Sequence, residues 1–300
     1  MPLSAVLAVG LAAALDYAIE EFPRPVHPVA IFGCVLEPLD RSWRFPRVAG
    51  AVGVVSAAAV AAGLAAGLVA VARGIDPLLG GLVAGVVMFS TTSLRMLLRT
   101  AREAIKSSEG DPRAARDSLP ALVGRDPDAL SPAEIRSAAV ESAAENLSDA
   151  LVAPLAAFAA FAPLSLPLAA GATAFLKAVN TADSMLGYRS KPVGWAAARL
   201  DDAFMWLPAR LTAVAIAFAA LDPATLARAR PEAAAPPSPN SGWPMATLAA
   251  VLPARFSKPG AYDLFPESDL PSPAAAMEGI GVVARAGALS ILVAGVIAWS

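Results

Sequence analysis

The sequence predicts an all-α, polytopic integral membrane protein, and three observations lead to this fold class. Of the 300 residues, 57% are hydrophobic and 16% are charged, whereas soluble domains average about a quarter charged residues. The run 48–72 contains no charged residue, and at about 1.5 Å per residue it is long enough for one bilayer crossing. A second uncharged run covers 150–176. We therefore expect about four to six transmembrane or re-entrant helices with a cytoplasmic helical region.

We expect one membrane-embedded domain over 1–300. Spans are predicted near 3–19, 48–72, 77–98, 150–176, 203–221 and 279–299, and polar regions at 99–149, 177–202 and 222–278. Within the fourth span, Pro163 and Pro167 leave two halves that are each too short to cross about 30 Å of hydrocarbon. We interpret it as a re-entrant hairpin, with a kinked single span as the alternative. The Pro-, Ala- and Ser-rich segment 222–243 is typical of an exposed linker.

Glycines recur in the second and third spans. They predict close backbone approach between helices 48–72 and 77–98, although simple filler in an alanine-rich chain would give the same composition. The residues are Gly50, Gly53, Gly63, Gly67, Gly80, Gly81 and Gly85.

Basic residues flank these two spans and predict the orientation of the chain. Arg41, Arg44 and Arg47 precede the second span, and Arg95, Arg99, Arg102 and Lys106 follow the third. The positive-inside rule places both flanks in the cytoplasm and the turn 73–76 outside. We expect a multi-pass protein of the cytoplasmic membrane with its active site facing the cytoplasm.

The composition also excludes several classes of site and partner. A net charge of −2 gives no basic face for nucleic acid, so no nucleic-acid partner is expected. Cys34 and His27 are single, which excludes an intrachain disulfide, a thiolate cluster and a His-rich zinc site. A metal would therefore be Mg²⁺ held by carboxylates and substrate phosphates. The sequence contains no Walker A and no dinucleotide-binding glycine motif.

A helix with three carboxylates is predicted after Ser131, an N-cap that Pro132 follows. Glu141, Glu145 and Asp149 recur every four residues, which lines them along one helical face. No lysine or arginine follows Glu141 on this helix to relieve their repulsion. We interpret this face as a divalent-cation or amine site, with metal ligands Glu145 and Asp149; a solvated face is the alternative. Asn146 lies close by.

The polar segment 177–210 lies between two apolar segments and is the most informative part of the chain, because charges at a membrane boundary are rarely without a use. Lys177, Arg199 and Arg210 are candidates for binding phosphates. Asn180 lies on the same helical face as Lys177. Asp201 and Asp202 are adjacent, so their side chains diverge by about 100° on a helix. Structural ion pairs are the alternative. The remaining candidates of this segment are Asp183 and Tyr188.

Three further residues are weaker candidates for substrate or ATP binding. His27 precedes a proline near the end of the first helix, where a lone histidine can also be structural. Glu109 and Arg125 lie at two predicted helix breaks, where plain turn chemistry is the alternative.

Several sequence blocks, in this order along the chain, resemble the CobD/CbiB family of membrane-bound adenosylcobinamide-phosphate synthases. Each block alone is weak, but the set is specific and covers most of the chain. The blocks are HPVAIFG (27–33), EGDPRAARDSLPALVGRD (109–126), AAVESAAENLSDALVAPL (138–155), KAVNTADSMLGYRS (177–190), GWAAARLDD (194–202), LPARLTA (207–213), SPNSGWP (238–244) and KPGAYDL (258–264).

The resemblance implies a ligase in cobalamin biosynthesis. It implies ATP-dependent amide ligation of adenosylcobyric acid with (R)-1-amino-2-propanol or its O-phosphate, giving adenosylcobinamide or its phosphate, with ATP and Mg²⁺ as cofactors. Glu141, Glu145, Asp183 and Lys177 are then the expected catalytic residues, because an acyl phosphate needs cationic stabilisation and the attacking amine must lose a proton. The expected partners are the corrinoid, the aminopropanol and the bilayer, with a homo-oligomer or a complex with other cobalamin-pathway membrane enzymes.

The chain departs from the family pattern at two points. Pro236 and Pro237 stand where the family places a histidine, and Met245 stands where it tends to carry glutamate. A membrane-embedded prenyltransferase is the main alternative, because Asn180 to Asp183 matches an N-x-x-D diphosphate site. A full aspartate-rich motif on two helices is missing from the sequence. A transporter is a third class, although no inverted repeat is evident.

Overall fold

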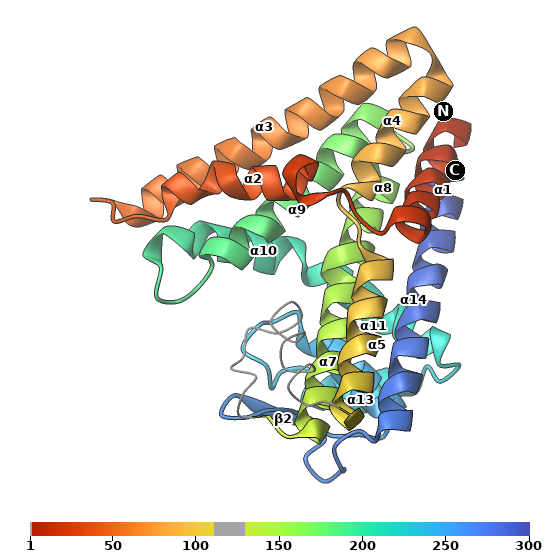
Figure 1. Cartoon of the computed structure of the whole chain (residues 1–300). Helices are drawn as coiled ribbons and strands as arrows, with labels where there is room; N and C mark the ends of the chain where they lie inside the picture. Colours follow the sequence, from red (N-terminus) through yellow and green to blue (C-terminus); the bar gives the residue numbers. More distant parts are fainter. Residues whose placement is uncertain (1, 111–129) are drawn as a thin grey trace. The chain divides into compact units, whose positions relative to one another are not determined.

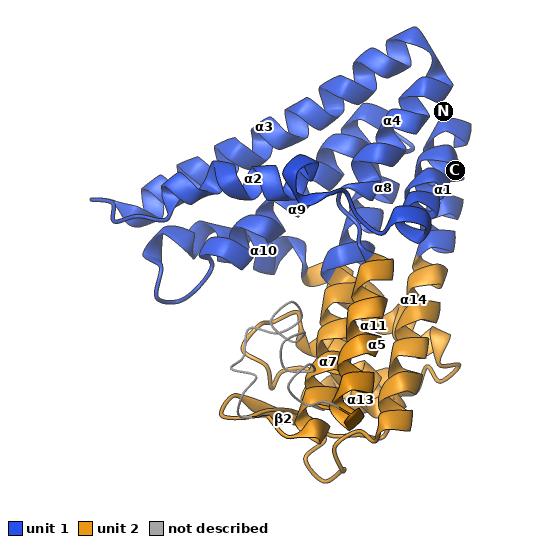
Figure 2. Cartoon of the chain, in the orientation of Figure 1, with its two compact units in different colours: residues 1–93, 149–205, 291–300 blue, residues 94–148, 206–290 orange. Residues whose placement is uncertain are grey.

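The computed structural model describes residues 2–110 and 130–300 and shows an almost entirely helical protein, so the all-α polytopic fold class is confirmed (Figure 1). The chain divides into two compact units (Figure 2). Unit 1 comprises Met1–Ser93, Asp149–Met205 and Ile291–Ser300, and unit 2 comprises Leu94–Ser148 and Trp206–Ser290. The expectation of one membrane-embedded domain stays a prediction.

Unit 1 is built around a long apolar helix, α3, and the helix α9 that packs along it. Its elements are α1 (Pro2–Ile19), η1 (Arg24–Val26), α2 (Pro28–Leu36), η2 (Glu37–Leu39), α3 (Pro46–Ile75), α4 (Pro77–Phe89), the π-helix η5 (Ser148–Val152), α8 (Ala153–Phe161), α9 (Leu166–Leu186), η6 (Pro192–Gly194) and α10 (Trp195–Phe204).

The turn between α3 and α4 is set by local chemistry. Asp76 ends α3 and is the N-cap of α4, where its Oδ1 accepts hydrogen bonds from Leu78 N (2.8 Å) and Leu79 N (3.0 Å). Pro77 occupies the first position of α4, where a helix has no use for the missing N–H. The short connection expected from the sequence is therefore present.

The small residues of α3 and α4 permit close packing, but mostly against partners other than those predicted. Added side-chain carbons at Gly81 and Gly85 would meet α1, and one at Gly50 would meet the backbone of Val193 in η6. Only Gly80, against Arg73, packs at the α3–α4 junction, while Gly63 and Gly67 meet nothing. α3 and α4 do contact each other, as predicted, but the spacing of the glycines did not identify α1 and η6 as the partners of Gly81, Gly85 and Gly50.

The fourth apolar run is broken, as its prolines predicted. α8 ends at Phe161, α9 begins at Leu166, and the two helices pack against each other (Figure 1). Neither helix is among the candidate membrane spans of the described residues. The kinked single span is therefore not supported, and the re-entrant placement stays a prediction.

Unit 2 is a helical bundle with a small β-hairpin. It contains α5 (Leu94–Gly110), α7 (Pro132–Leu147), α11 (Trp206–Ala219), α12 (Thr225–Glu232), α13 (Gly242–Val251) and most of α14 (Pro273–Trp299). Strands β1 (Phe256–Lys258) and β2 (Tyr262–Leu264) pair antiparallel, with Ser257 opposite Asp263. The hairpin was not predicted from the sequence.

Two sequence expectations for unit 2 have different outcomes. α7 begins as predicted, since Ser131 and Glu134 form a capping box and Pro132 follows the cap. The linker predicted over 222–243 is instead partly helical, because α12 packs on α13 with Ala229 and Thr225 fully buried.

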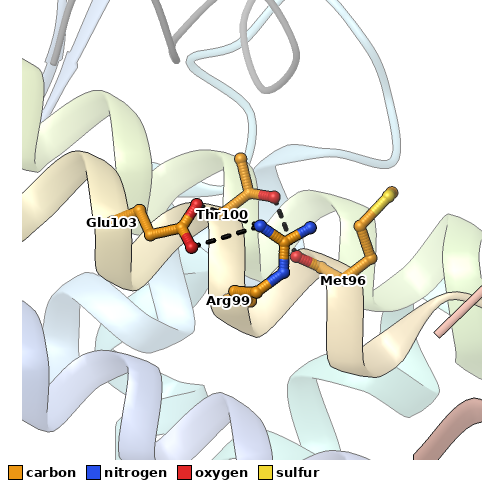
Figure 3. Close-up of polar contacts among 4 residues, drawn as sticks. All are labelled: Met96, Arg99, Thr100 and Glu103. Atoms are coloured by element: carbon orange, nitrogen blue, oxygen red, sulfur yellow. Dashed lines mark hydrogen bonds and ion pairs between the residues drawn. The ribbon is translucent and has the colours of Figure 1, made fainter. Parts of the chain in front are cut away.

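α5 is amphipathic, and its polar side carries an exposed ion pair (Figure 3). Arg99 Nη1 donates to both carboxylate oxygens of Glu103, at 3.2 and 3.1 Å, and Thr100 Oγ1 donates to the carbonyl of Met96. Both charged side chains are about half exposed, so the pair adds little stability. The apolar side, including Leu97, Ala101 and Ile105, is buried against α7.

Four stretches of the described residues are long and apolar enough to cross a membrane. They are Pro2–Ile19, Pro46–Ile75, Pro77–Gly110 and Pro273–Trp299. A fifth is added if Pro192–Phe204 and Trp206–Ala219, bent by 45°, cross as one broken span. A multi-pass membrane protein follows from these helices.

Candidate functional site

The candidate site lies in unit 1 on the polar side of α9. The opposite side of α9 is fixed by apolar packing: Ala182 and Leu186 are fully buried with Val54 of α3 and Leu36 of α2. Gly171 packs against the backbone of Ala62 in α3, which leaves no room for a side chain there. Because the apolar face is held in this way, α9 has a defined rotation about its axis.

Asn180 is the centre of the site and joins three segments. Its buried Nδ2 donates to Asp149 Oδ2 at 3.3 Å and to Asp201 Oδ1 at 3.2 Å. Asp149 comes from the π-helix η5 and Asp201 from α10. One side-chain amide therefore serves two carboxylates, and the structure brings together Asn180, Asp149 and Asp201 from distant parts of the sequence.

Lys177 is the cation of this cluster. Its Nζ donates a long hydrogen bond, 3.5 Å, to the backbone carbonyl of Asp149. Burial lowers the pKa of Lys177, and the charges of Asp149, Glu21 and Asp201 act in the opposite direction. The ammonium therefore lies within electrostatic range of several carboxylates.

Asp183 lies one helical turn beyond Asn180 and carries a perturbed carboxyl group. Burial, followed by the charges of Asp202 and Asp149, raises the pKa of Asp183 from 3.8 to about 6. A side chain at Gly187 would collide with this carboxylate, so glycine is required to leave it space. Burial likewise raises the pKa of Asp149.

Acidic groups exceed basic ones in this cluster. Asp149, Asp183, Asp201 and Asp202 repel one another electrostatically. Lys177 faces Asp149 and Asp201, and the exposed Arg199 pairs with Asp202. Such an arrangement attracts a cation or a protonated amine, and perturbed carboxyls in one cluster are typical of functional sites.

The fit of this cluster to a metal ion can be judged from its donors. Within residues 2–110 and 130–300, no three His, Cys, Asp or Glu side chains form a ready metal site. Mg²⁺, however, commonly takes one or two carboxylates and completes its shell with water and substrate phosphates. Asp149 and Asp201, which share Asn180, fit such a site.

A cavity of about 540 Å³ adjoins the cluster and includes Lys177 in its wall. Its other walls are mostly apolar and come from α2, α3, the end of α4 and α9. Thr181, Ser90 and Thr91 supply hydroxyl groups to the lining. Lys177 therefore lies between an acidic cluster and a largely apolar cavity, as a residue that contacts an amphipathic substrate would.

His27 has a structural contact as well as a position near the cluster. It is the N-cap of α2, where Nδ1 accepts a hydrogen bond from Val29 N at 3.1 Å. Burial lowers the pKa of His27, while the charge of Glu21 raises it and that of Lys177 lowers it. The neutral imidazole is therefore favoured. Its Nδ1 has a structural role, because it caps the first turn of α2.

Two other residues of the 177–210 segment lie more exposed. Arg199 is exposed and forms a long ion pair, 3.9 Å, with Asp202. Tyr188 is 60% exposed, and the ammonium of Lys191 lies 5.4 Å from its ring centroid. The contact of Arg199 with Asp202 is thus of the kind expected if the charges of this segment form structural ion pairs.

Arg210 belongs to unit 2 and holds the loop before α13. Its Nη1 donates to Asn240 Oδ1 (2.7 Å) and to the carbonyl of Trp206, and its Nη2 donates to the carbonyl of Pro239. The guanidinium also lies 4.5 Å from the ring of Trp206 and 5.2 Å from that of Trp243. These contacts give Arg210 a positioning role, and its predicted contact with phosphate stays a prediction.

Glu141 is also in unit 2, where its carboxylate is buried and accepts hydrogen bonds. It is only 1% exposed and accepts hydrogen bonds from Ser137 Oγ (2.7 Å) and Tyr262 OH (2.8 Å). Ser137 Oγ in turn accepts from Ser257 N of the hairpin. The alternative of a solvated face is wrong for Glu141, because Ser137 and the hairpin cover it.

The predicted carboxylate face does not continue as a regular α-helix. α7 ends at Leu147 and a π-helix follows, so Asp149 is not in α-helical register with Glu141 and Glu145. Asp149 belongs to unit 1 and Glu145 to unit 2. The metal site shared by Glu145 and Asp149 therefore stays a prediction.

The remaining candidates have simpler surroundings. Asn146 Nδ2 donates to the carbonyl and the hydroxyl of Ser142, one turn earlier in α7. Glu109 is exposed near the end of α5. Arg125 lies outside the described residues.

Sequence reasoning missed three residues around these carboxylates. Glu21 follows α1 and acts electrostatically on Lys177 and His27. Ser137 precedes Glu141 by four residues, a spacing that could have indicated the contact. Tyr262 is 121 residues away from Glu141 on a hairpin that was not predicted, so no local signal could have found it.

Comparison with known proteins gives one consistent result. The profile of the family described as "CobD/Cbib protein" matches residues 9–282. A "Probable cobalamin biosynthesis protein CobD" of Methanothrix thermoacetophila is 36% identical, over 94% of this chain and 93% of that protein. A "Cobalamin biosynthesis protein CobD" of Rhodobacter capsulatus is 35% identical over 98% and 97%. A protein of that name from Mycobacterium tuberculosis is 39% identical over 80% and 77%. No solved structure matches the chain significantly.

Proposed function

This chain belongs to the CobD/CbiB family of cobalamin biosynthesis proteins, and from this premise we propose that it is the ATP-dependent ligase of that pathway. It would join the free carboxylate of adenosylcobyric acid to (R)-1-amino-2-propanol, or to its O-phosphate, through an amide bond. The observation that carries the proposal is the junction of Asn180 with Asp149 and Asp201 beside Lys177, because all four residues fall in sequence blocks that resemble the family.

The reaction requires two changes in charge that this cluster suits. ATP transfers its terminal phosphoryl group to the substrate carboxylate, which forms an acyl phosphate and releases ADP. The amine nitrogen then attacks the acyl carbon, phosphate leaves, and the nitrogen loses its proton. The first step needs a cation near the transferring phosphoryl group, and the second needs a base.

Lys177 is the residue we assign to the phosphoryl group. Its ammonium reaches the edge of the cavity and also faces the acidic cluster. A lysine binds phosphate as a compact point charge, and the attraction between ammonium and phosphate is stronger where water is excluded. We therefore assign Lys177 to the transferring phosphoryl oxygens, with Arg199 as a more exposed phosphate contact.

Asp183 is the residue we assign to the amine. A carboxyl with a pKa of about 6 is largely ionised at neutral pH and can still accept a proton readily. Its negative charge attracts the ammonium form of the aminopropanol, and its basicity suits removal of the proton during attack. The neighbouring carboxylates strengthen both effects by repelling its charge.

Mg²⁺ would be held by Asp149 and Asp201 together with the phosphates of ATP, and it would supply electrostatic stabilisation of the phosphate charge. Asn180 would orient these two carboxylates, because its Nδ2 donates to both. The membrane location follows from the apolar helices. We propose the cytoplasmic membrane, with the site facing the cytoplasm where ATP is present.

A direct assay tests the proposal. Purified protein is incubated with ATP, Mg²⁺, adenosylcobyric acid and either aminopropanol or its phosphate, and ADP is measured together with the corrinoid product. ADP release that depends on both co-substrates supports the ligase. Pyrophosphate release from a prenyl diphosphate, with no corrinoid amide formed, would instead support the prenyltransferase.

A further inference from the structure

A basic and aromatic patch lies at the N-terminal end of α3 and contains none of the residues assigned to the candidate site. It consists of Arg41, Trp43, Arg44, Phe45, Arg47 and Trp195, and we call it the basic–aromatic patch. We propose that this patch binds the phosphate headgroups of acidic membrane phospholipids and anchors the start of the α3 span at the membrane interface.

The three arginines are arranged on aromatic rings. The guanidinium of Arg41 lies 4.1 Å from the ring centroid of Trp43, and that of Arg44 lies 5.2 Å from Phe45. Arg47 lies 5.8 Å from Trp195, which begins α10. Stacking on a ring restricts the guanidinium while leaving its edge N–H groups available for oxygen acceptors.

The charge of these arginines is not neutralised within the described part of the chain. All three are exposed, and no ion pair to a described carboxylate holds Arg41, Arg44 or Arg47. The adjacent Asp40 pairs instead with Lys191 Nζ at 2.7 Å. Three cationic groups therefore face outward within seven residues of sequence.

The patch continues directly into lipid-facing surface. α3 begins at Pro46 and is a candidate membrane span of 30 residues. Val48 and Val52, in its first two turns, are 63% and 62% exposed, and Phe45 is 64% exposed. Exposed valines on a span are expected to meet acyl chains, and exposed aromatics and arginines at its end are typical of the headgroup region.

These observations favour a lipid headgroup over other anions. A phosphodiester offers paired oxygens that match the planar guanidinium, and its acyl chains would lie along the apolar face that α3 presents. A free anion in water would gain nothing from Val48, Val52 or Phe45. Juxtamembrane clusters of basic residues are known to select acidic lipids electrostatically.

The test uses the full chain in a neutral detergent and needs no cobalamin substrate, so it is independent of the ligase proposal. Phosphatidylglycerol or phosphatidylcholine is titrated in, and bound lipid is counted by native mass spectrometry. The variant is R41Q/R44Q/R47Q. The matched control is R73Q/R228Q/R230Q, which removes the same charge at the other end of α3 and on α12. Circular dichroism and melting temperature verify folding.

We expect the wild-type chain and the control to bind phosphatidylglycerol more tightly than phosphatidylcholine, with binding weakened at 0.5 M salt. The triple glutamine variant should lose about a hundredfold in affinity for phosphatidylglycerol at low salt. If that variant fails to fold, the single variants R41Q and R44Q replace it, and each should lose about fivefold in affinity for phosphatidylglycerol. Equal binding of both lipids would overturn the proposal. So would equal loss in the control, or displacement of the lipid by inorganic phosphate at millimolar concentration.

Discussion

A buried carboxylate in unit 2 and a partly buried cluster of carboxylates in unit 1 differ in how their charge is compensated. In unit 2, Glu141 receives hydrogen bonds from Ser137 and Tyr262 and anchors the hairpin. In unit 1, Asn180 Nδ2 is shared between two carboxylates, and the pKa of nearby Asp183 rises to about 6. A fully hydrogen-bonded carboxylate stabilises the fold, whereas a cluster in which carboxylates outnumber cations is costly and is expected where a ligand supplies the missing charge.

The largest effect is expected at Lys177. Replacing it with methionine removes the cation assigned to the transferring phosphoryl group but keeps the length of the side chain. We expect kcat/KM for amide formation to fall by about a thousandfold, in the range for loss of one preorganised charge. Lys106→Met, at an exposed position of α5, is the control and should leave kcat/KM unchanged. A Lys177→Met enzyme of full activity would remove Lys177 from the mechanism.

Replacing Asp201 should change activity and stability in opposite directions. Burial, followed by the charges of Asp149 and Asp183, raises the pKa of Asp201 to about 8. Compared with the wild type above pH 8, Asp201→Asn keeps a side chain able to contact Asn180 and removes one of several repelling charges. We expect kcat/KM to fall by about a hundredfold, while the melting temperature rises by about 2 °C as repulsion is relieved. Asp263→Asn, at an exposed position of the hairpin, should change neither kcat/KM nor the melting temperature. A lower melting temperature with unaltered activity would mean that Asp201 is structural.

The pH dependence should report Asp183. Its pKa is raised in the folded state, so the folded chain retains a proton between about pH 4 and pH 6 that the unfolded chain has lost. Stability from this group therefore decreases as pH rises through about 6, whereas activity increases because the carboxylate forms. Below pH 6, kcat/KM should fall about tenfold per unit. If the Asp183→Asn enzyme showed the same fall in kcat/KM below pH 6, the titrating group would be a residue other than Asp183.

The smallest effect on catalysis is expected at Tyr262. Tyr262→Phe removes one donor to the buried Glu141 and should lower the free energy of unfolding by about 1–3 kcal/mol. The kcat/KM should stay within about twofold of the wild-type value, since the hydroxyl serves the fold of unit 2. The control for stability is Tyr188→Phe, at an exposed position. A large loss of activity at unchanged stability would give Tyr262 a catalytic role.

Local patterns in the sequence predicted much of the fold. The uncharged run 48–72 became α3, and Ser131 and Pro132 opened α7 as expected. The contact of α3 with α4 was predicted, but the packing of their glycines against α1 and η6 was not, and α12 was predicted as a linker, because these features depend on contacts between distant segments. The π-helix after Leu147 likewise leaves no signal in residue spacing.

The candidate site was predicted unevenly for the same reason. Lys177, Asn180 and Asp183 lie on one helix, so their spacing was sufficient to group them. That Asp201 meets Asn180 depends on how α10 packs beside α9. Arg210 carried the same phosphate assignment as Lys177, and both assignments stay predictions. The hydrogen bonds from Arg210 to the loop before α13 depend on tertiary packing and left no signal in the sequence.

The most direct measurement compares Asp183→Asn with Glu141→Gln in the same preparation, by steady-state ligation and by thermal melting. Asp183→Asn should lose about a hundredfold or more in kcat/KM with its melting temperature unchanged or raised. Glu141→Gln should melt at a lower temperature while its kcat/KM stays within about twofold of the wild-type value. If Glu141→Gln abolished ligation without loss of stability while Asp183→Asn remained active, the site would lie in unit 2 and the account would be wrong.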